Sequence, residues 1–594
     1  MKRSVLIFVL IAVVVAGAFF VLRLRGTEAE ALKLAPAGTV CFVDFPDIAR
    51  SKYRWKQTAL HQLGEEPEVQ AFLERPESKL PGLDAIREKE RRLFSLNPRE
   101  AFFALTSIKE EVPKFIAGLK FTGKKEDLDS LLDEARARMH AAWPAGTADL
   151  AKYGPVEIET FTGADVTLAA AFHKQWYFVS DDLDLLKTTL DRLDGKPDLP
   201  GGSLGGEARF KASAGHLPKQ SDALVFVQLE TVTQRLLSLV AAAGGQLPPG
   251  KLEQLKNIQA VAGALKLDGE NIRDAVFILD PGAKKEEPMQ RASLVLTSTN
   301  TLFYYAGVLH LPSSLPPLSS GAPALLSGLA AASQALAGRG LDRAGFEAAF
   351  GPEYASLLDW PAGNPQPALL FSLDVRDPGK AAKFLDSMFE SPLGAAWVRQ
   401  RIGGTAFYVM TSSRIPTVTP SLALTDKFLL LGPNFEEVKM EVQSLRNRSA
   451  NLDKTSTLDK TSTFQAAEGM VPKPTGSCGY IDGQAICERV YGTLRPFAIL
   501  WANFAPRLRE TMDPGKLPAT ETLARHLGPI VRSESVSGEG ALIESAGTVT
   551  FNELLAGIAA GAGVAAFPTI KTYLQNARSL SPGGPASSPG PNGR

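Results

Sequence analysis

A nucleophilic serine is the first chemistry that the sequence suggests. Gly201-Gly202-Ser203-Leu204-Gly205 has the G-x-S-x-G spacing of a nucleophile elbow, in which a sharp turn between a strand and a helix presents the hydroxyl. Here the motif instead follows a helical pattern and the loop Asp194 to Pro200, with no strand before it. We therefore interpret Ser203 as part of a flexible loop, and a serine hydrolase is the alternative that this motif leaves open.

Clustered carboxylates offer a second chemistry. Asp181, Asp182 and Asp184 supply oxygen ligands of the kind that calcium and magnesium prefer. They also stand where a helix is predicted to begin, and acidic residues in a first turn stabilise the helix dipole and its unpaired amides. We favour this structural role over a metal site.

Histidines and basic residues give weaker signals. Gly123-Lys124-Lys125 lacks the upstream glycine and downstream hydroxyl of a phosphate loop, so we interpret it as a turn that opens a helix. The histidines lack the i, i+4 pairing and the neighbouring cysteines that zinc sites usually show. They are His61, His140, His173, His216, His310 and His526.

Two arginines occupy matching positions in two related helices. Arg235 and Arg489 could each clamp a carboxylate or a phosphate. An intramolecular ion pair is the commoner role, and both interpretations stay open. We predict no catalytic, cofactor-binding or metal-binding residue and no cofactor, and the ligand-binding residues stay unknown.

Cysteine usage excludes a disulfide framework, because the chain has only Cys41, Cys478 and Cys487. Cys478 lies in a predicted strand and Cys487 in the helix after it. A bridge between them is one alternative, and two small buried thiols are the other. We favour the buried thiols.

Composition is that of a globular protein, with 44% hydrophobic and 22% charged residues over 594 positions. This length exceeds what one hydrophobic core usually supports, so we expect more than one domain. Lysine plus arginine equals aspartate plus glutamate at 64 each. No global field therefore favours nucleic acid, which we exclude as a partner.

One strand-to-helix pattern organises the chain because it occurs twice. Trp176-Tyr177-Phe178-Val179 and Phe428-Leu429-Leu430-Leu431 each read as a strand that runs into a capped helix. Both helices repeat apolar residues with one periodicity, which predicts a buried face. These residues are Leu183, Leu186, Leu190 and Leu193, and 252 positions later Phe435, Val438, Val442 and Leu445.

A second block of matches has an offset two residues longer, as a difference in loop length would give. In it Phe210, Gly215, Phe226, Val227, Val232, Arg235 and Leu236 match Phe464, Gly469, Tyr480, Ile481, Ile486, Arg489 and Val490. Asp268-Gly269-Glu270-Asn271 predicts a hairpin, with a counterpart around Ser537-Gly538-Glu539-Gly540. The chain is predicted to be a tandem duplication.

Further elements are predicted from local patterns. Thr39 to Phe45, Phe115 to Phe121 and Val156 to Phe161 read as strands, and Glu126 to Met139 as a helix. Asn97-Pro98 reads as a helix entry, with asparagine as N-cap and proline at the first helical position.

The N-terminus predicts a membrane anchor. Lys2-Arg3 precedes an apolar run from Val5 to Leu22, long enough to cross a hydrocarbon core. A cleavable signal peptide is the alternative, since Ala29-Glu30-Ala31 has a small-x-small form, but Arg23 and Arg25 intervene. We expect a single-pass protein of the cytoplasmic membrane with its bulk on the extracytoplasmic side.

The C-terminus carries another apolar segment, Leu554 to Phe567, with a Gly557-x-x-x-Gly561 spacing. It is shorter than a spanning helix, so we favour a buried or interfacial helix over a second membrane segment. The proline-, glycine- and serine-rich tail after it is expected to be disordered.

The predicted fold is α+β, with two tandem related lobes, each a mainly antiparallel sheet covered by helices, after an N-terminal transmembrane helix. The domains are 1–30, anchor and stem; 31–285 and 286–550, the two lobes; 551–578, the apolar glycine-rich helix; and 579–594, the tail.

Several segments together resemble a bacterial family of membrane-anchored envelope proteins, domain of unknown function 3352. They are the anchor, the strand near Thr39 with Phe45-Pro46-Asp47-Ile48, the segment Glu66-Pro67-Glu68-Val69-Gln70-Ala71-Phe72-Leu73, and Ser203-Leu204 with Phe210. The resemblance covers most of residues 35 to 550. It implies an exported, repeat-built α+β protein and supplies no catalytic residues.

We expect a non-enzymatic structural or interaction protein of the cell envelope, held to the membrane by Val5 to Leu22 and partnered by an envelope protein or a lipid. A binding module for an apolar or lipid-like ligand between the lobes is the first alternative. An envelope serine hydrolase that uses Ser203 is the second.

Overall fold

A computed structural model of the chain describes residues 30–554, apart from 79–82, 109–112, 164–166, 198, 200, 243–256, 311–341, 362–363, 365, 391–395, 412–417, 451–456 and 502–512. The predicted anchor Val5 to Leu22, nearly all of the apolar segment Leu554 to Phe567 and the tail 579–594 lie outside these residues. Within the described part, every helix is too short or too polar to cross a membrane.

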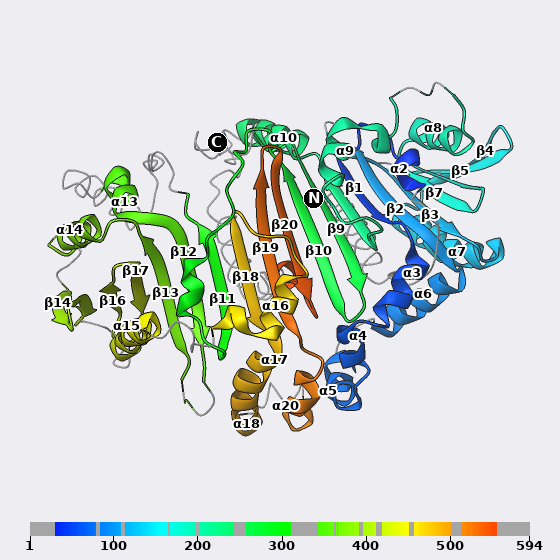
Figure 1. The fold of residues 1–594 in the computed structure, drawn as a ribbon. Coiled ribbons are helices and arrows are strands. Elements are labelled where there is room, and N and C mark those ends of the chain that lie inside the picture. The colour runs from blue at the N-terminus through cyan, green and yellow to red at the C-terminus, as the bar shows by residue number, and fades with distance from the viewer. Residues whose placement is uncertain are drawn as a thin grey trace, which may run out of the picture.

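All twenty described strands belong to one antiparallel sheet (Figure 1). From the outer edge to the middle, the first ten are β4 (Thr147–Tyr153), β5 (Val156–Thr162), β6 (Thr167–His173), β7 (Trp176–Ser180), β3 (Lys114–Phe121), β2 (Pro98–Ser107), β1 (Cys41–Phe45), β8 (Ala223–Val227), β9 (Ala260–Asp268) and β10 (Asn271–Leu279).

The sheet continues across the β10–β20 pair, in which Ile272 faces Gly547 and Leu279 faces Gly540. From the middle to the other edge follow β20 (Gly540–Gly547), β19 (Pro529–Ser537), β18 (Ser477–Asp482), β11 (Thr301–Val308), β12 (Phe350–Asp359), β13 (Ala368–Val375), β17 (Phe428–Gly432), β16 (Ser421–Leu424), β15 (Thr405–Met410) and β14 (Trp397–Ile402).

The chain is therefore mixed α+β, as predicted, but a division into two lobes is not shown. The strands of both halves hydrogen-bond across the middle instead of forming separate sheets. Each half nevertheless has the same strand order. When the ten strands of each half are numbered along the chain, the fourth to seventh lie at the outer edge of the sheet. The third, second and first follow in that order, and the eighth to tenth lie nearest the middle.

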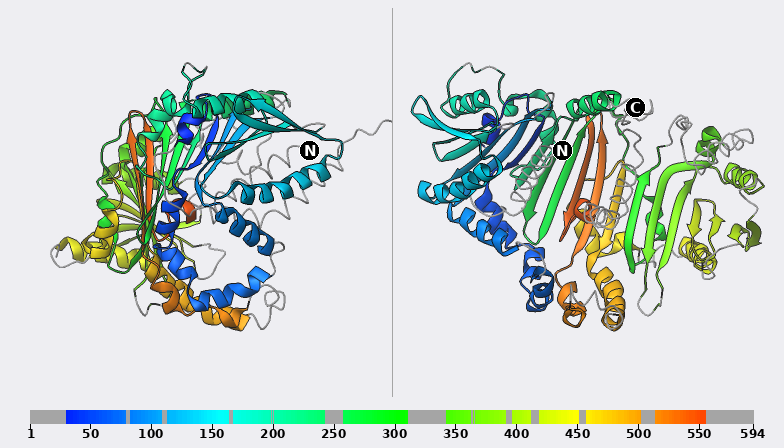
Figure 2. Two further views of the ribbon diagram at one scale, coloured as in Figure 1. Left: turned by 90° about the vertical axis from the view of Figure 1, so that its right-hand side faces the viewer. Right: turned by 180° about the vertical axis from the view of Figure 1, so that it is seen from behind.

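Helices cover both faces of the sheet, which Figure 2 shows in its left view. In the first half they are α2 (Ala31–Leu34), α3 (Ile48–Trp55), α4 (Ala59–Gly64), α5 (Pro67–Ser78), α6 (Leu83–Ser95), α7 (Lys125–Ala142), α8 (Leu183–Leu193), α9 (Ala208–Ala214) and α10 (Leu229–Ala242), with a 3₁₀ turn, η1 (Leu204–Gly206). Helix α8 packs on one face and α7 on the other.

The second half repeats much of this arrangement. Its helices are α13 (Arg343–Ala349), α14 (Pro378–Phe389), α15 (Phe435–Ala450), α16 (Ser462–Glu468), α17 (Gly483–Ile486), α18 (Gly492–Trp501) and α20 (Thr520–Ala524). Its shorter helical turns are η2 (Ala292–Leu296), η5 (Leu458–Lys460), η6 (Cys487–Tyr491) and η7 (Pro514–Lys516).

The periodic residues of α8 and α15 face the core as predicted, although Leu183, Leu193, Phe435 and Leu445 are only half-buried. Leu186 and Leu190 in α8, and Val438 and Val442 in α15, are each at most 3% exposed. Capping begins α8, because the Asp182 carboxylate accepts the amides of Asp184 and Leu185. The predicted strand-to-helix segments and the hairpin β9–β10 are thus confirmed.

The predicted helix entry at Asn97-Pro98 is wrong, because strand β2 begins at Pro98. Asn97 has φ 52°, in the left-handed region that asparagine tolerates better than most residues. Proline is tolerated at the first position of a strand and is common at the first position of a helix. The same dipeptide therefore fits both elements, and the pairing of β2 with β1 and β3 decides between them.

Candidate functional site

Ser203 does not stand on a strand-to-helix elbow. Gly201 and Gly202 before it have φ of 84° and 62°, and Ser203 itself makes an isolated bridge to Pro36 before the single turn η1. An elbow needs a strand of the sheet to end at the serine. The geometry around Ser203 is that of a loop, as predicted.

The three aspartates at α8 serve the local fold. Asp182 accepts the first amides of α8 and lies 2.8 Å from Lys114 Nζ. Asp181 accepts the amide of Phe115 at 2.8 Å, and burial raises the pKa of Asp181 to about 6. Among the described residues no three metal-ligating side chains of His, Cys, Asp or Glu gather in one place.

The histidines are spread over the molecule and contact carboxylates or aromatic rings. His173 meets Asp194 at 2.7 Å, His216 meets Glu539 at 2.9 Å, His310 meets Glu286 at 2.8 Å and His526 meets Glu66 at 2.6 Å. His61 stacks on Trp55, and His140 contacts the edge of Phe161. The three cysteines are free thiols, and burial raises the pKa of Cys478 to about 11.

Arg235 and Arg489 do not meet in one site. Arg235 lies on α10 and Arg489 on η6, at opposite ends of the strands in Figures 1 and 2. Arg489 donates from Nη1 to the carbonyl oxygen of Trp360 at 3.1 Å. This contact places Arg489 in the wall of a cavity, which makes its surroundings the candidate site.

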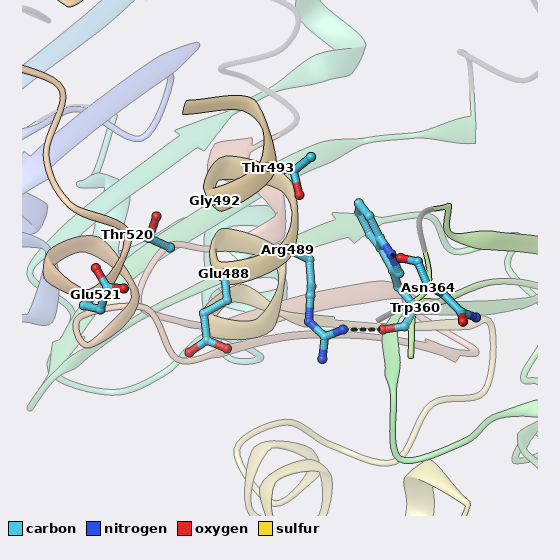
Figure 3. Close-up of a pocket in the computed structure, with 8 residues that line it drawn as sticks. All are labelled: Trp360, Asn364, Glu488, Arg489, Gly492, Thr493, Thr520 and Glu521. Atoms are coloured by element: carbon cyan, nitrogen blue, oxygen red, sulfur yellow. Dashed lines mark hydrogen bonds between the residues drawn. The ribbon is translucent and has the colours of Figure 1, made fainter. Parts of the chain in front are cut away.

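The cavity has a volume of about 470 Å³ and lies beside α18 and α20 at the bottom of Figure 1, and Figure 3 shows the residues that line it. It is lined by Trp360, Asn364, Glu488, Arg489, Gly492, Thr493, Thr520 and Glu521. These residues come from the segment just after β12, from η6, from the start of α18 and from α20. Elements far apart in the sequence therefore form one site.

Local sequence explains the shape of its helical wall. Asp482 ends β18 and caps α17 by accepting the amide of Ala485 at 2.9 Å. The helix then widens into the π-helical turn η6 before α18 begins at Gly492. Pro496 inside α18 cannot donate to the preceding turn. Such π turns occur frequently at functional sites.

Two contacts hold α18 against the segment before α20. The Tyr491 hydroxyl donates to the carbonyl oxygen of Pro518 at 2.7 Å, and Arg495 Nη2 donates to that of Leu517 at 3.0 Å. These contacts, one from η6 and one from α18, link the helical wall of the cavity to the segment before α20.

The segment Glu66 to Leu73 supports this region from the first half. In α5 and just before it, Glu66 accepts from His526 at 2.6 Å, and Glu68 accepts the amide of Ala519 at 2.6 Å. Arg525 lies 2.5 Å from Glu66. We call these contacts the α5–α20 clamp.

The cavity is more acidic than basic. The Glu488 carboxylate accepts from Gln484 Nε2 at 3.0 Å and is exposed, as is Glu521. Arg489 is the one cation in the lining, and its guanidinium is already bound to Trp360. The lining hydroxyls, Thr493 and Thr520, have no histidine beside them in the lining. Two exposed carboxylates beside a single guanidinium favour binding of a cation.

Helix α18 leaves the cavity with an apolar side exposed. Leu494, Phe497, Leu500 and Trp501 are 57%, 65%, 59% and 71% exposed. Their spacing of three, three and one places them on one side of the helix, and we call them the α18 stripe. Large apolar side chains gathered on a surface mark interaction sites more often than scattered ones do.

No family model matches the sequence, and no curated protein does. Among solved structures, crystal form III of TP0453 is similar at 10% identity, over 48% of this chain and 90% of that chain, with a TM-score of 0.24. Crystal form IV of TP0453 gives 10% identity, 42% and 81%, and a TM-score of 0.23. Scores this low establish neither fold nor function.

Sequence reasoning found Arg489 through its match with Arg235 but missed the rest of the site. Trp360 lies in another part of the sequence and reaches Arg489 only through the pairing of β12, β11 and β18. The stripe was readable as an apolar periodicity. Such a periodicity normally predicts a buried side, so its exposure could not be foreseen.

Proposed function

We propose that the protein is a non-enzymatic, membrane-anchored protein of the cell envelope that binds a partner protein through the α18 stripe. The observation that carries this proposal is the exposure of four large apolar side chains along one side of a ten-residue helix. Keeping such side chains in water is unfavourable by roughly 25 cal/mol per Å² of apolar surface. A bound partner removes that cost.

The two halves of the chain are related, and we propose that only the second half carries the binding surface. Phe210 meets Phe226 edge to face with centroids 5.3 Å apart, and Phe464 meets Tyr480 in the same way at 5.1 Å. We infer that the two halves descend from one unit. The helix after β8 and the helices after β18 correspond, and in the latter the α18 stripe is exposed.

The anchor and the family resemblance belong to the same proposal. Val5 to Leu22 would hold the chain at the membrane with its bulk on the extracytoplasmic side. Replacing Val13 and Val14 by arginine should release the protein from carbonate-washed membranes, because charge at the centre of a span is costly. Retention of that variant would contradict an anchor at this segment.

Quantitative affinity purification from solubilised membranes tests the binding role. The double variant Phe497→Ser, Leu500→Ser should lose a stoichiometric co-purifying protein that the wild type retains, since the stripe supplies its apolar contacts. The control is Leu150→Ser with Val398→Ser, two exposed apolar residues on the edge strands β4 and β14. An unchanged set of co-purifying proteins in the stripe variant would contradict the proposal.

Binding of an apolar or lipid-like ligand is a second candidate function. Val225 on β8 and the neighbours Phe371 and Leu431 on β13 and β17 expose apolar surface on the sheet. Native mass spectrometry of the solubilised protein would then detect a bound lipid.

A hydrolase that uses Ser203 is tested by Ser203→Ala, which should leave any esterase signal unchanged if our proposal holds.

A further inference from the structure

The α18 stripe and the cavity form one continuous surface. Thr493 lines the cavity and is the residue before Leu494, where the stripe begins. Figure 3 shows the Thr493 side chain on the side of the helix that faces Trp360 and Asn364, which lie in the segment after β12. A partner that covers the stripe therefore passes the mouth of the cavity.

The area of the stripe argues against a second copy of this chain as the occupant. Its four side chains expose on the order of 500 Å² of apolar surface. A stable interface between folded proteins buries about 800 Å² on each partner. The stripe is the right size for one amphipathic helix, which lays three or four anchoring side chains along such a surface.

The charge of the cavity indicates which kind of polar side chain the partner carries. Glu488 and Glu521 present two exposed carboxylates, and Arg489, which donates to the neutral Trp360 carbonyl, offsets one of these two negative charges. The Trp360 indole is itself held by a hydrogen bond from Nε1 to the carbonyl oxygen of Asn364 at 2.9 Å. Exposed carboxylates attract ammonium and guanidinium groups. They repel the phosphates of an anionic membrane surface.

We propose that the occupant is an amphipathic helix of the partner protein, whose apolar side chains cover the α18 stripe and whose lysine or arginine side chain pairs with Glu488 and Glu521 at the cavity. This inference rests on the proposed function and adds the chemistry of the partner. The apolar contacts supply most of the affinity, and the basic side chain fixes the direction of the helix.

Fluorescence anisotropy with synthetic peptides tests the inference on the full chain in detergent. The probe is a labelled helical peptide of leucine and lysine in an amphipathic pattern, and its counterpart has glutamate in place of lysine. The wild type should bind the leucine–lysine peptide and prefer it clearly to the leucine–glutamate peptide. Glu488→Gln with Glu521→Gln should weaken binding of the lysine peptide by roughly fivefold, as expected for two exposed charge pairs.

Two variants separate the charge of the cavity from general electrostatics and from the stripe. Glu126→Gln with Glu157→Gln makes the same change in net charge at exposed positions elsewhere and should leave the affinity unchanged. Phe497→Ser with Leu500→Ser should abolish binding of both peptides. Circular dichroism of each variant verifies that it is folded.

Each outcome has a distinct meaning. If the stripe variant loses binding but the Glu488, Glu521 variant keeps full affinity, the basic side chain is refuted and the binding role of the stripe stands. If the stripe variant binds as the wild type does, both proposals fail. Binding to phosphatidylglycerol vesicles that needs the stripe, without binding to the peptides, would replace the helix by a lipid surface. A concentration-dependent dimer lost in the stripe variant would replace it by a second copy.

Discussion

At the scale of single residues, the least satisfied group of the described chain lies far from the candidate site. Asp44 on β1 is fully buried, and neither of its carboxylate oxygens meets a donor in good hydrogen-bond geometry, although the nearby Phe45 amide favours the charged form. Burial, and then the charge of Glu100, raises the pKa of Asp44 well above its usual range. Burial also raises the pKa of Glu100 to about 7, although the amides of Ala31 and Glu30 oppose this. The native state therefore holds protons that the unfolded chain has released.

Stability should consequently fall as pH rises from about 4, where free carboxyl groups titrate, through the raised pKa values of the folded state. Asp44→Asn removes one titrating group without changing its shape. We predict that this variant matches the wild type near pH 4 and has a higher free energy of unfolding than the wild type at pH 8. Urea denaturation across this range measures the effect. The exposed Asp149→Asn is the control, and identical pH profiles for Asp44→Asn and wild type would refute the role of Asp44.

At the scale of elements, the α5–α20 clamp should determine how firmly the wall of the cavity is held. The hydrogen bond with His526 is the largest cause that lowers the pKa of Glu66, and Arg525 lowers it further. The clamp is therefore strongest above the pKa of a free glutamate and weakens as pH falls through the lowered value. Loss of these contacts frees α20 from the first half.

We predict that Glu66→Gln accelerates amide hydrogen exchange severalfold in residues 513–526, because local opening of this segment becomes easier. Glu74→Gln is a matched control, since Glu74 pairs with Lys516 at 3.0 Å but is 74% exposed. An exposed pair of that kind contributes little. Equal exchange in Glu66→Gln and the wild type would show that the clamp does not hold α20.

Elements with strong local signals were predictable, and those defined by tertiary contacts were not. Helices α8 and α15 each have an N-cap residue and an apolar periodicity, and the turn between β9 and β10 has a glycine with positive φ. These local signals are visible in the sequence. Strand β4 is exposed along nearly its whole length and has no apolar alternation to reveal it. At Asn97-Pro98 the local signal was ambiguous, and pairing with β1 and β3 resolved it.

At the scale of the whole molecule, the repeat in the sequence predicted equivalent elements but not how they join. Nothing in the periodicity of Leu186 or Val438 indicates that β10 and β20 pair along their full length. The candidate site depends on such long-range pairing, because β12, β11 and β18 bring Trp360 to Arg489. The polar cavity and the stripe both belong to the second half, although the two halves share one strand order.

The central claim is that the α18 stripe meets a partner protein while the chain is anchored in its own membrane. Photo-crosslinking in living cells tests this most directly, with p-benzoylphenylalanine in place of Leu500 on α18 and, as the control, in place of Leu150 on β4, both exposed. We predict one discrete protein adduct from position 500 and none from position 150. Adducts from neither position, or the same adducts from both, would contradict the account.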